Sequence, residues 1–317
     1  MNNEFKQIII NNKEVLPGHT KSINLNIARL PSRTEIEIPV IVHRAKLDGP
    51  VVLFSAGMHG NEVNGIEIIR RIITEKIHTH IFRGTIILIP IINIYGFLHF
   101  RRSTPDGKDL NRSFPGSQNG SLASMIAWNI TNKILPVVEY GVDFHTGGDM
   151  RTNYPQIRAD MSFTENEGLA CAFGAPFVMN MPVLDHTFRK QAQKAGKSIL
   201  VYEGGESMRF DDLAIESAIL GVKRYLNYLE MSDFIVSAPR YHFINSTTWV
   251  RAKSSGMFRS LIQYGEKVKK NQVIGIITDP YGEHDQKQKS PINGFIVGMN
   301  NISIVNKGDA LFHIGEE

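Results

Sequence analysis

The chain has 317 residues, 42% of them hydrophobic, which is enough to bury a large core and excludes a disordered protein. Its formal net charge of +4 is spread along the sequence, and the small cluster Lys267, Lys269 and Lys270 is too short to form a nucleic-acid-binding stripe. The single cysteine, Cys171, excludes an internal disulfide framework and is typical of a reducing compartment. The longest apolar run, 86–92, is far shorter than the roughly 20 residues that span a bilayer. We therefore expect a cytoplasmic protein with neither a nucleic-acid partner nor a membrane partner.

Short β-branched runs alternate with helical patterns between residues 50 and 235. In chain order the expected elements are strand 51–56, helix 63–77, strand 85–91, helix 122–137, strand 141–144, strand 175–179, helix 187–195, strand 198–203 and helix 212–229. Such alternation requires crossover connections and predicts the α/β class, with a mixed, largely parallel central sheet and helices on both faces. The Ile-rich segments 8–10 and 35–42 are expected to pair as strands at one edge of this sheet.

The composition changes near Ser237-Ala238-Pro239, after which helical periodicity disappears. The expected strands there are 249–252, 256–262, 272–278, 294–298 and 310–314, and they are separated by Gly, Asn and Asp. We therefore predict two domains, a main domain over 1–237 and a small all-β domain over 238–317.

The pattern His-x-x-Glu occurs twice, at His59–Glu62 and at His313–Glu316. The first copy follows a predicted strand and precedes a predicted helix, and Gly57 and Gly60 permit the sharp turn that this junction needs. The second copy lies in a Gly-rich tail with no helix after it, so we interpret it as a surface coincidence. The first copy is the candidate for chemistry.

Side chains of metal-ligand type follow three predicted strands. His59 and Glu62 follow the first strand, Asp143 and His145 close another, and Glu203 closes a third. Ligands of open α/β sheets gather beyond the carboxyl ends of the strands, and catalytic zinc sites keep three ligands of His and carboxylate type. We expect one zinc ion per chain on His59, Glu62 and His145, with Glu203 as the general base. Asp143 either orients a ligand or is a plain capping carboxylate.

The segment 100–116 is too polar and too rich in Gly and Pro for a core element, so we expect a loop. It carries Arg102, Asn111 and Arg112. Guanidinium groups bind carboxylates through paired hydrogen bonds, although arginines in loops are usually solvated. These three residues are the candidates for substrate binding.

Four motifs, taken together, resemble the succinylglutamate desuccinylase/aspartoacylase family of zinc carboxypeptidase-like hydrolases. They are Gly57-x-His59-Gly60-Asn61-Glu62, Asp109-Leu110-Asn111-Arg112-x-Phe114-Pro115-Gly116, Asp143-x-His145-Thr146 and Glu203-Gly204-Gly205, in this order. The resemblance covers about residues 50–315 and implies the zinc carboxypeptidase-like fold, with 1–237 as the catalytic domain. It also implies zinc on the two histidines and Glu62, and a Glu203 that promotes attack of water on an amide.

The same resemblance implies that Arg102, Asn111 and Arg112 hold a substrate carboxylate or the polarised carbonyl oxygen. Arg101 competes with Arg102, because shorter relatives place the first arginine closer to the Asn-Arg pair. Arg151 and Arg158 are further candidates for specificity, but a surface location explains them equally well. Segments 265–272 and 293–295 are similar to the barrel-sandwich of lipoyl and biotinyl carriers without their attachment lysine, so the all-β domain is expected to be a scaffold or a rim of the active-site cleft.

The predicted activity is that of a zinc-dependent deacylase that hydrolyses the amide bond of a small anionic N-acyl amino acid. A zinc carboxypeptidase that acts on short peptides would use the same groups. A catalytically idle metal-binding module is the third alternative. Such a module would not need both the metal ligands and the general base. A homo-oligomer is compatible with the sequence, which does not reveal the acyl group or the amino acid.

Overall fold

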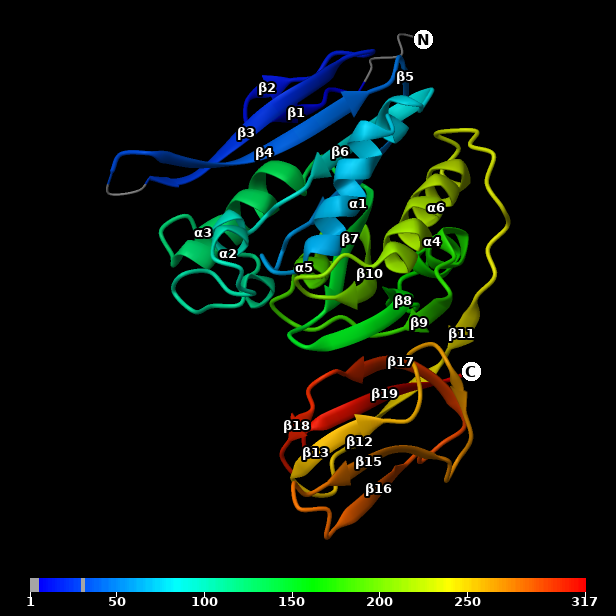
Figure 1. Ribbon diagram of the computed structural model, residues 1–317. Helices are drawn as coiled ribbons and strands as arrows, with labels where there is room; N and C mark the ends of the chain where they lie inside the picture. Colours follow the sequence, from blue (N-terminus) through cyan, green and yellow to red (C-terminus); the bar gives the residue numbers. More distant parts are fainter. Residues whose placement is uncertain (1–5, 30–31) are drawn as a thin grey trace.

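The structure, a computed structural model, describes residues 6–29 and 32–317 (Figure 1). A mixed sheet of 13 strands has the order β12-β19-β17-β8-β10-β7-β5-β6-β4-β3, with β9, β11 and β14 paired at its sides. Its strands are β3 Thr20–Arg29, β4 Glu35–Arg44, β5 Leu47–Ala56, β6 Arg83–Ile89, β7 Tyr140–Gly147, β8 Arg151–Ala159, β9 Phe177–Asn180, β10 Ser198–Glu206, β11 His242–Ile244, β12 Ser246–Arg251, β14 Lys267–Val268, β17 Gly294–Asn300 and β19 Ala310–Glu316. The central strands β10, β7, β5 and β6 are parallel, so their carboxyl ends lie at one edge.

Helices cover both faces of the central strands (Figure 1). The helical segments are α1 Val63–Thr74, α2 Ile94–Leu98, α3 Leu122–Asn129, α4 Asn166–Phe173, α5 Phe188–Lys194 and α6 Asp212–Tyr228, with the short turns η1 Ile77–Thr79, η2 Leu110–Arg112 and η3 Ile130–Ile134. Along β5, Val52 and Phe54 join the core beneath α1, α4 and α6, whereas Val51 and Leu53 join the core beneath α3 and α5. Successive side chains of a strand point to opposite faces, which explains why residues 51–54 of this strand are all apolar.

The C-terminal residues form an antiparallel β region with an apolar core of its own, which includes Phe258, Ile277 and Phe312. Four of its strands form a separate sheet, β13 Gly256–Ser260, β15 Val273–Thr278, β16 Asp285–Lys289 and β18 Ile304–Val305. Strand β17 nevertheless pairs with β8, and β11 pairs with β9, so the large sheet continues into this region. The mixed α/β class with an antiparallel C-terminal region is confirmed, whereas the domain boundary at residue 238 stays a prediction.

The expected strands and helices between residues 50 and 235 are all present, with ends that differ by a few residues. The predicted pairing at the N-terminus is wrong. Ile9–Ile10 (β1) pairs with Lys13–Glu14 (β2) in a small sheet of its own, and β4 pairs with β3, a strand that the pattern did not reveal. A two-residue strand forms only a local hairpin, whereas β3 pairs with β4 along its length and buries Ile23, Leu25 and Ile27 on one face.

The interpretation of His313–Glu316 as a surface coincidence is wrong for the histidine. His313 lies in β19 and is buried, although Glu316 is exposed. Glycine in this tail does not mark a loop, because Gly315 lies within the same strand. Of the residues that the structure describes, none belongs to a helix long and apolar enough to cross a membrane.

Candidate active site

The turn between β5 and α1 presents His59 and Glu62. Gly57 has a φ of +60°, which only glycine adopts at little cost, and a Cβ on Gly60 would lie 1.9 Å from the backbone carbon of Gly96. The chain can therefore fold back tightly here only with glycine at both positions. Glu62 occupies the N-cap position of α1, so its carboxylate emerges where the helix begins.

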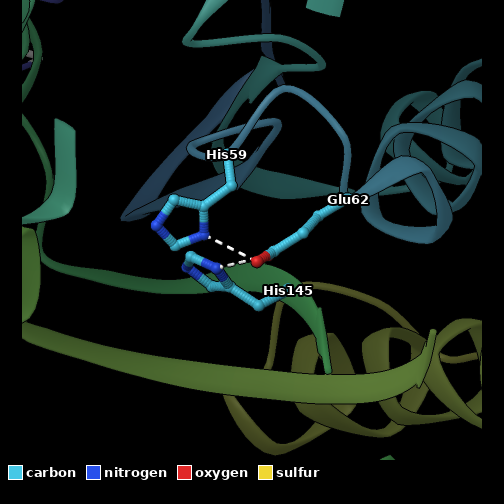
Figure 2. Close-up of side chains that lie close together, drawn as sticks. All are labelled: His59, Glu62 and His145. Carbon is cyan, nitrogen blue, oxygen red and sulfur yellow. Dashed lines mark hydrogen bonds and ion pairs between the residues drawn. The ribbon is translucent and has the colours of Figure 1, made fainter. Parts of the chain in front are cut away.

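His59, Glu62 and His145 converge on one buried point (Figure 2). Nδ1 of His59 lies 2.7 Å from Oε1 of Glu62, and Nδ1 of His145 lies 2.8 Å from Oε2 of the same carboxylate. The ligand atoms of all three residues lie within 4.8 Å of one another. Parallel pairing of β5 with β7 aligns Ser55 with Asp143 and so brings the ends of the two strands together.

Each imidazole attracts the Glu62 carboxylate electrostatically. Burial raises the pKa of Glu62, but the charges and hydrogen bonds of His59 and His145 outweigh it and hold that pKa well below its usual range. Burial lowers the pKa of each histidine, but nearby carboxylates outweigh it and raise both values. The site is thus a compact, buried set of one carboxylate and two imidazoles, in which the carboxylate and each imidazole favour the charged form of the other.

A second carboxylate fixes the far nitrogen of each histidine. Nε2 of His59 lies 3.1 Å from Oδ1 of Asp109, and Nε2 of His145 lies 2.8 Å from Oδ2 of Asp143. Such carboxylate–histidine pairs orient the imidazoles of metal sites and leave the other nitrogen for the ion. Two Nδ1 atoms and the Glu62 carboxylate are therefore suited to hold a divalent cation. The expected Asp143 contact to a ligand histidine is present.

Glu203 lies beside this cluster in a pocket of about 660 Å³. In the parallel ladder of β10 and β7, Glu203 is the register neighbour of His145. Asn153 Nδ2 donates to one carboxylate oxygen of Glu203 at 2.8 Å, and Arg158 Nη1 donates to the other at 2.8 Å. Glu206, the next carboxylate along β10, does not line the pocket and instead accepts a hydrogen bond from Asn301.

Arg102, Asn111 and Arg112 all line the pocket, as expected from their loop, whereas Arg101 is exposed and does not line it. Arg102 binds two carboxylates, with Nη1 3.0 Å from Glu62 and Nη2 2.9 Å from Asp109. Its guanidinium therefore also braces the cluster.

The other two loop residues differ in their freedom. Asn111 Oδ1 accepts a hydrogen bond from the backbone of Phe188 at 3.0 Å. Arg112 is exposed, and its Nη1 donates to the carbonyl of Asn111 at 2.7 Å. Of the two pocket arginines in this loop, Arg112 is thus the more exposed.

Comparison with known proteins gives a family for this site. Residues 48–229, more than half of the chain, match the succinylglutamate desuccinylase/aspartoacylase catalytic domain. The chain belongs to the succinylglutamate desuccinylase/aspartoacylase family. The predicted family is therefore confirmed.

Relatives of this family member extend over nearly its whole length. N-alpha-acetyl-L-2,4-diaminobutyric acid deacetylase of Halomonas elongata is 27% identical over 299 residues, which cover 89% of this chain and 86% of the relative. The crystal structure of succinylglutamate desuccinylase/aspartoacylase from Rhodobacter sphaeroides has a TM-score of 0.82 at 24% identity and covers 94% of this chain and 95% of that one. The product-bound ectoine utilization protein of Ruegeria pomeroyi has a TM-score of 0.85 at 20% identity, and all of both chains is covered. The two structures show that the fold is shared.

One pocket residue of this family member escaped the sequence analysis altogether. Arg189, in the first turn of α5, lines the pocket and donates only to backbone carbonyls, those of Arg158 and Pro182. No carboxylate pairs with it among the described residues. Burial and the charge of Arg158 lower the pKa of Arg189 to about 10. Its place near the start of the predicted helix 187–195 gave no signal of this role.

Asn64 also escaped notice, because it lies within a helical pattern. It is fully buried in α1, and its Nδ2 donates to the carbonyl of Gly204 at 3.1 Å. Its Oδ1 accepts from the backbone N–H of Asp211 at 3.0 Å. Asn64 therefore ties the helix that begins at Glu62 to the loop that follows Glu203.

Proposed function

We propose that this protein is a zinc-dependent deacylase that hydrolyses the amide bond of a small anionic N-acyl amino acid. The observation that carries the proposal is the position of Glu203, in the same pocket as the His59–Glu62–His145 cluster and next to His145 in the strand ladder. A general base beside a metal site is the arrangement that hydrolysis of an unactivated amide requires. Family membership supports the same class of reaction.

His59, Glu62 and His145 would hold the zinc ion through two imidazole nitrogens and one carboxylate. Bound there, zinc supplies Lewis-acid activation of the amide carbonyl and of the attacking water. Glu203 takes a proton from the water as the water oxygen forms a bond to the carbonyl carbon. Glu203 then gives this proton to the amide nitrogen as the C–N bond breaks. The products are a carboxylic acid and a free amino group.

The charge of the pocket supports an anionic substrate. Five arginines line it, against the three carboxylates of Glu62, Asp149 and Glu203. Arg102 and Arg158 already bind carboxylates of the protein, whereas Arg189 is half-buried without one among the described residues. A guanidinium in such a place is stabilised by an incoming carboxylate. Arg189 and Arg112 are therefore the arginines that we assign to the substrate.

A hydrolysis screen on purified, zinc-loaded protein tests the proposal. The panel contains N-acetyl and N-succinyl amino acids together with dipeptides, and the products are identified by mass spectrometry. We expect an organic acid and a free amino acid from the acylated compounds, and a kcat lower by on the order of 10²-fold or more in the Glu203→Gln protein. Cleavage of the dipeptides alone would establish a peptidase instead. Bound zinc with no turnover of any compound would establish an idle module.

A further inference from the structure

Backbone pairing fixes the C-terminal β region, residues 242–317, against the wall of the pocket. In the β17–β8 ladder, Gly298 pairs with Asn153, the residue that donates to Glu203. Gln156 in β8 is fully buried and donates to the carbonyl of Val297 at 2.8 Å. Figure 1 shows β17 and β19 lying along the edge of the catalytic sheet at β8. The C-terminal β region cannot move away without breaking its hydrogen bonds to β8, the strand whose Asn153 and Arg158 bind Glu203.

This region contributes one side chain to the pocket, Trp249 of β12. Trp249 pairs with His313 across the β12–β19 ladder, and their rings stack with centroids 4.3 Å apart and an interplanar angle of 1°. Arg151, another pocket residue, lies with its guanidinium carbon 5.9 Å from the centre of the Trp249 ring. The indole is therefore fixed in orientation, while 39% of Trp249 remains exposed.

The imidazole behind Trp249 is a neutral backing. His313 is 3% exposed, and burial lowers the pKa of its side chain to about 3. An uncharged ring stacked flat on an indole supports it rigidly. The stack holds Trp249 in one place without any requirement that a ligand be present.

The apolar lining of the pocket is separate in character from its charged lining. Its members come from the loop after β9, from β10 and from β12, and they are Met181, Pro182, Leu184, Val201 and Trp249. The charged lining residues already have proposed roles, as the metal cluster, the base and the anion-binding arginines. Apolar lining residues have no matching group in a substrate that consists only of a carboxylate and an acetylated amine.

We propose that Trp249 is a specificity-determining residue that packs against an apolar group of the substrate, so that the enzyme favours N-acyl amino acids larger than N-acetylalanine. The apolar group is either the acyl chain or the amino-acid side chain, and both are recognised by the same contact with the indole. This inference rests on the proposed deacylase function. It gives the C-terminal β region a direct part in substrate selection.

Steady-state kinetics with two substrate series test the inference. One series lengthens the acyl group from acetyl to butanoyl to hexanoyl on alanine, and the other keeps acetyl and changes alanine to leucine and phenylalanine. For Trp249→Ala we expect KM to rise about tenfold or more for the larger members of one series, with kcat nearly unchanged, as for loss of a hydrophobic pocket contact. N-acetylalanine should be affected little, and Trp249→Phe should retain most of the preference. The control is Trp128→Phe, because Trp128 lies in α3 and does not line the pocket.

Fluorescence gives a second readout that does not require turnover. Trp128 and Trp249 are the two tryptophans of the chain, so the Trp128→Phe protein reports on Trp249 alone. We expect either N-hexanoylalanine or N-acetylphenylalanine, whichever belongs to the affected series, to change its emission saturably, and to leave the emission of the Trp249→Phe protein unchanged. Where the wild type turns over both series, a KM change in Trp249→Ala that does not grow with substrate size in either series, or no emission change with either compound, would overturn the inference. Absence of wild-type turnover for every acylated compound would instead overturn the proposed function, while the titration still decides whether Trp249 contacts the ligand.

Discussion

His313 makes a quantitative prediction about acid stability. Its Nδ1 has no hydrogen-bond partner among the described residues, and burial, with a smaller effect of the Arg158 charge, lowers the pKa of His313 to about 3. An unfolded histidine has a pKa of about 6.5. Between these values the unfolded chain binds more protons than the folded chain, so folding becomes less favourable as the pH falls. The full stability is present above pH 6.5 and is lost progressively towards pH 3.

Each pH unit inside this window changes the free energy of unfolding by about 1.4 kcal/mol, so the wild type should lose about 2 kcal/mol between pH 7 and pH 5 through this one group. His313→Gln and His313→Phe do not titrate there, and their stability should fall less steeply by that amount, whatever its absolute value. Urea unfolding of metal-stripped protein at the two pH values measures the difference. The matched control is His99→Gln, because His99 is exposed. Equal pH dependence in the wild type and both His313 variants would refute the buried, neutral state of His313.

Three further predictions concern the pocket. His59→Ala should lose most of the bound zinc and essentially all activity, and stoichiometric zinc in that variant by elemental analysis would refute the ligand assignment. Glu203→Gln should keep zinc while kcat falls on the order of 10²-fold or more, the usual scale for a general base; normal turnover would place the base elsewhere. Arg189→Gln should raise KM for an N-acyl amino acid about tenfold with little change in kcat, and much less for the matching amide, because only the free acid carries the carboxylate. An equal loss for acid and amide would instead indicate a structural role for Arg189.

The metal cluster shows what a local pattern can supply. His59 and Glu62 can be predicted to lie close together, because they are three positions apart in a tight turn between a strand and a helix. His145 was inferred from its place after another strand, and the parallel pairing of β5 with β7 then puts it opposite Glu62. Strand ends carry this information because parallel strands must present their carboxyl ends at one edge.

Strand β8 shows where the local pattern fails. Its sequence, Arg151–Ala159, is largely polar and contains Pro155, features that argue against a central strand. The register between β8 and β10 shifts between Glu203 and Gly205, opposite the stretch that contains Pro155, so the missing N–H does not interrupt the ladder. The polar side chains are needed in the fold, since Asn153 and Arg158 bind Glu203. A strand whose side chains line a pocket lacks the alternation of hydrophobic and polar residues by which strands are predicted from sequence.

The sequence by itself determined the α/β class, the order of the central elements, the candidate ligands and the candidate base, because periodicity, glycine turns and motif spacing are local properties of the chain. Only the tertiary structure decided that Arg189 enters the pocket, that Arg102 braces Glu62, and that Trp249 and His313 of the C-terminal β region stack beside the site. These placements depend on which strands pair and in which register. Such choices follow from the packing of the whole sheet, and no spacing between neighbouring residues encodes them.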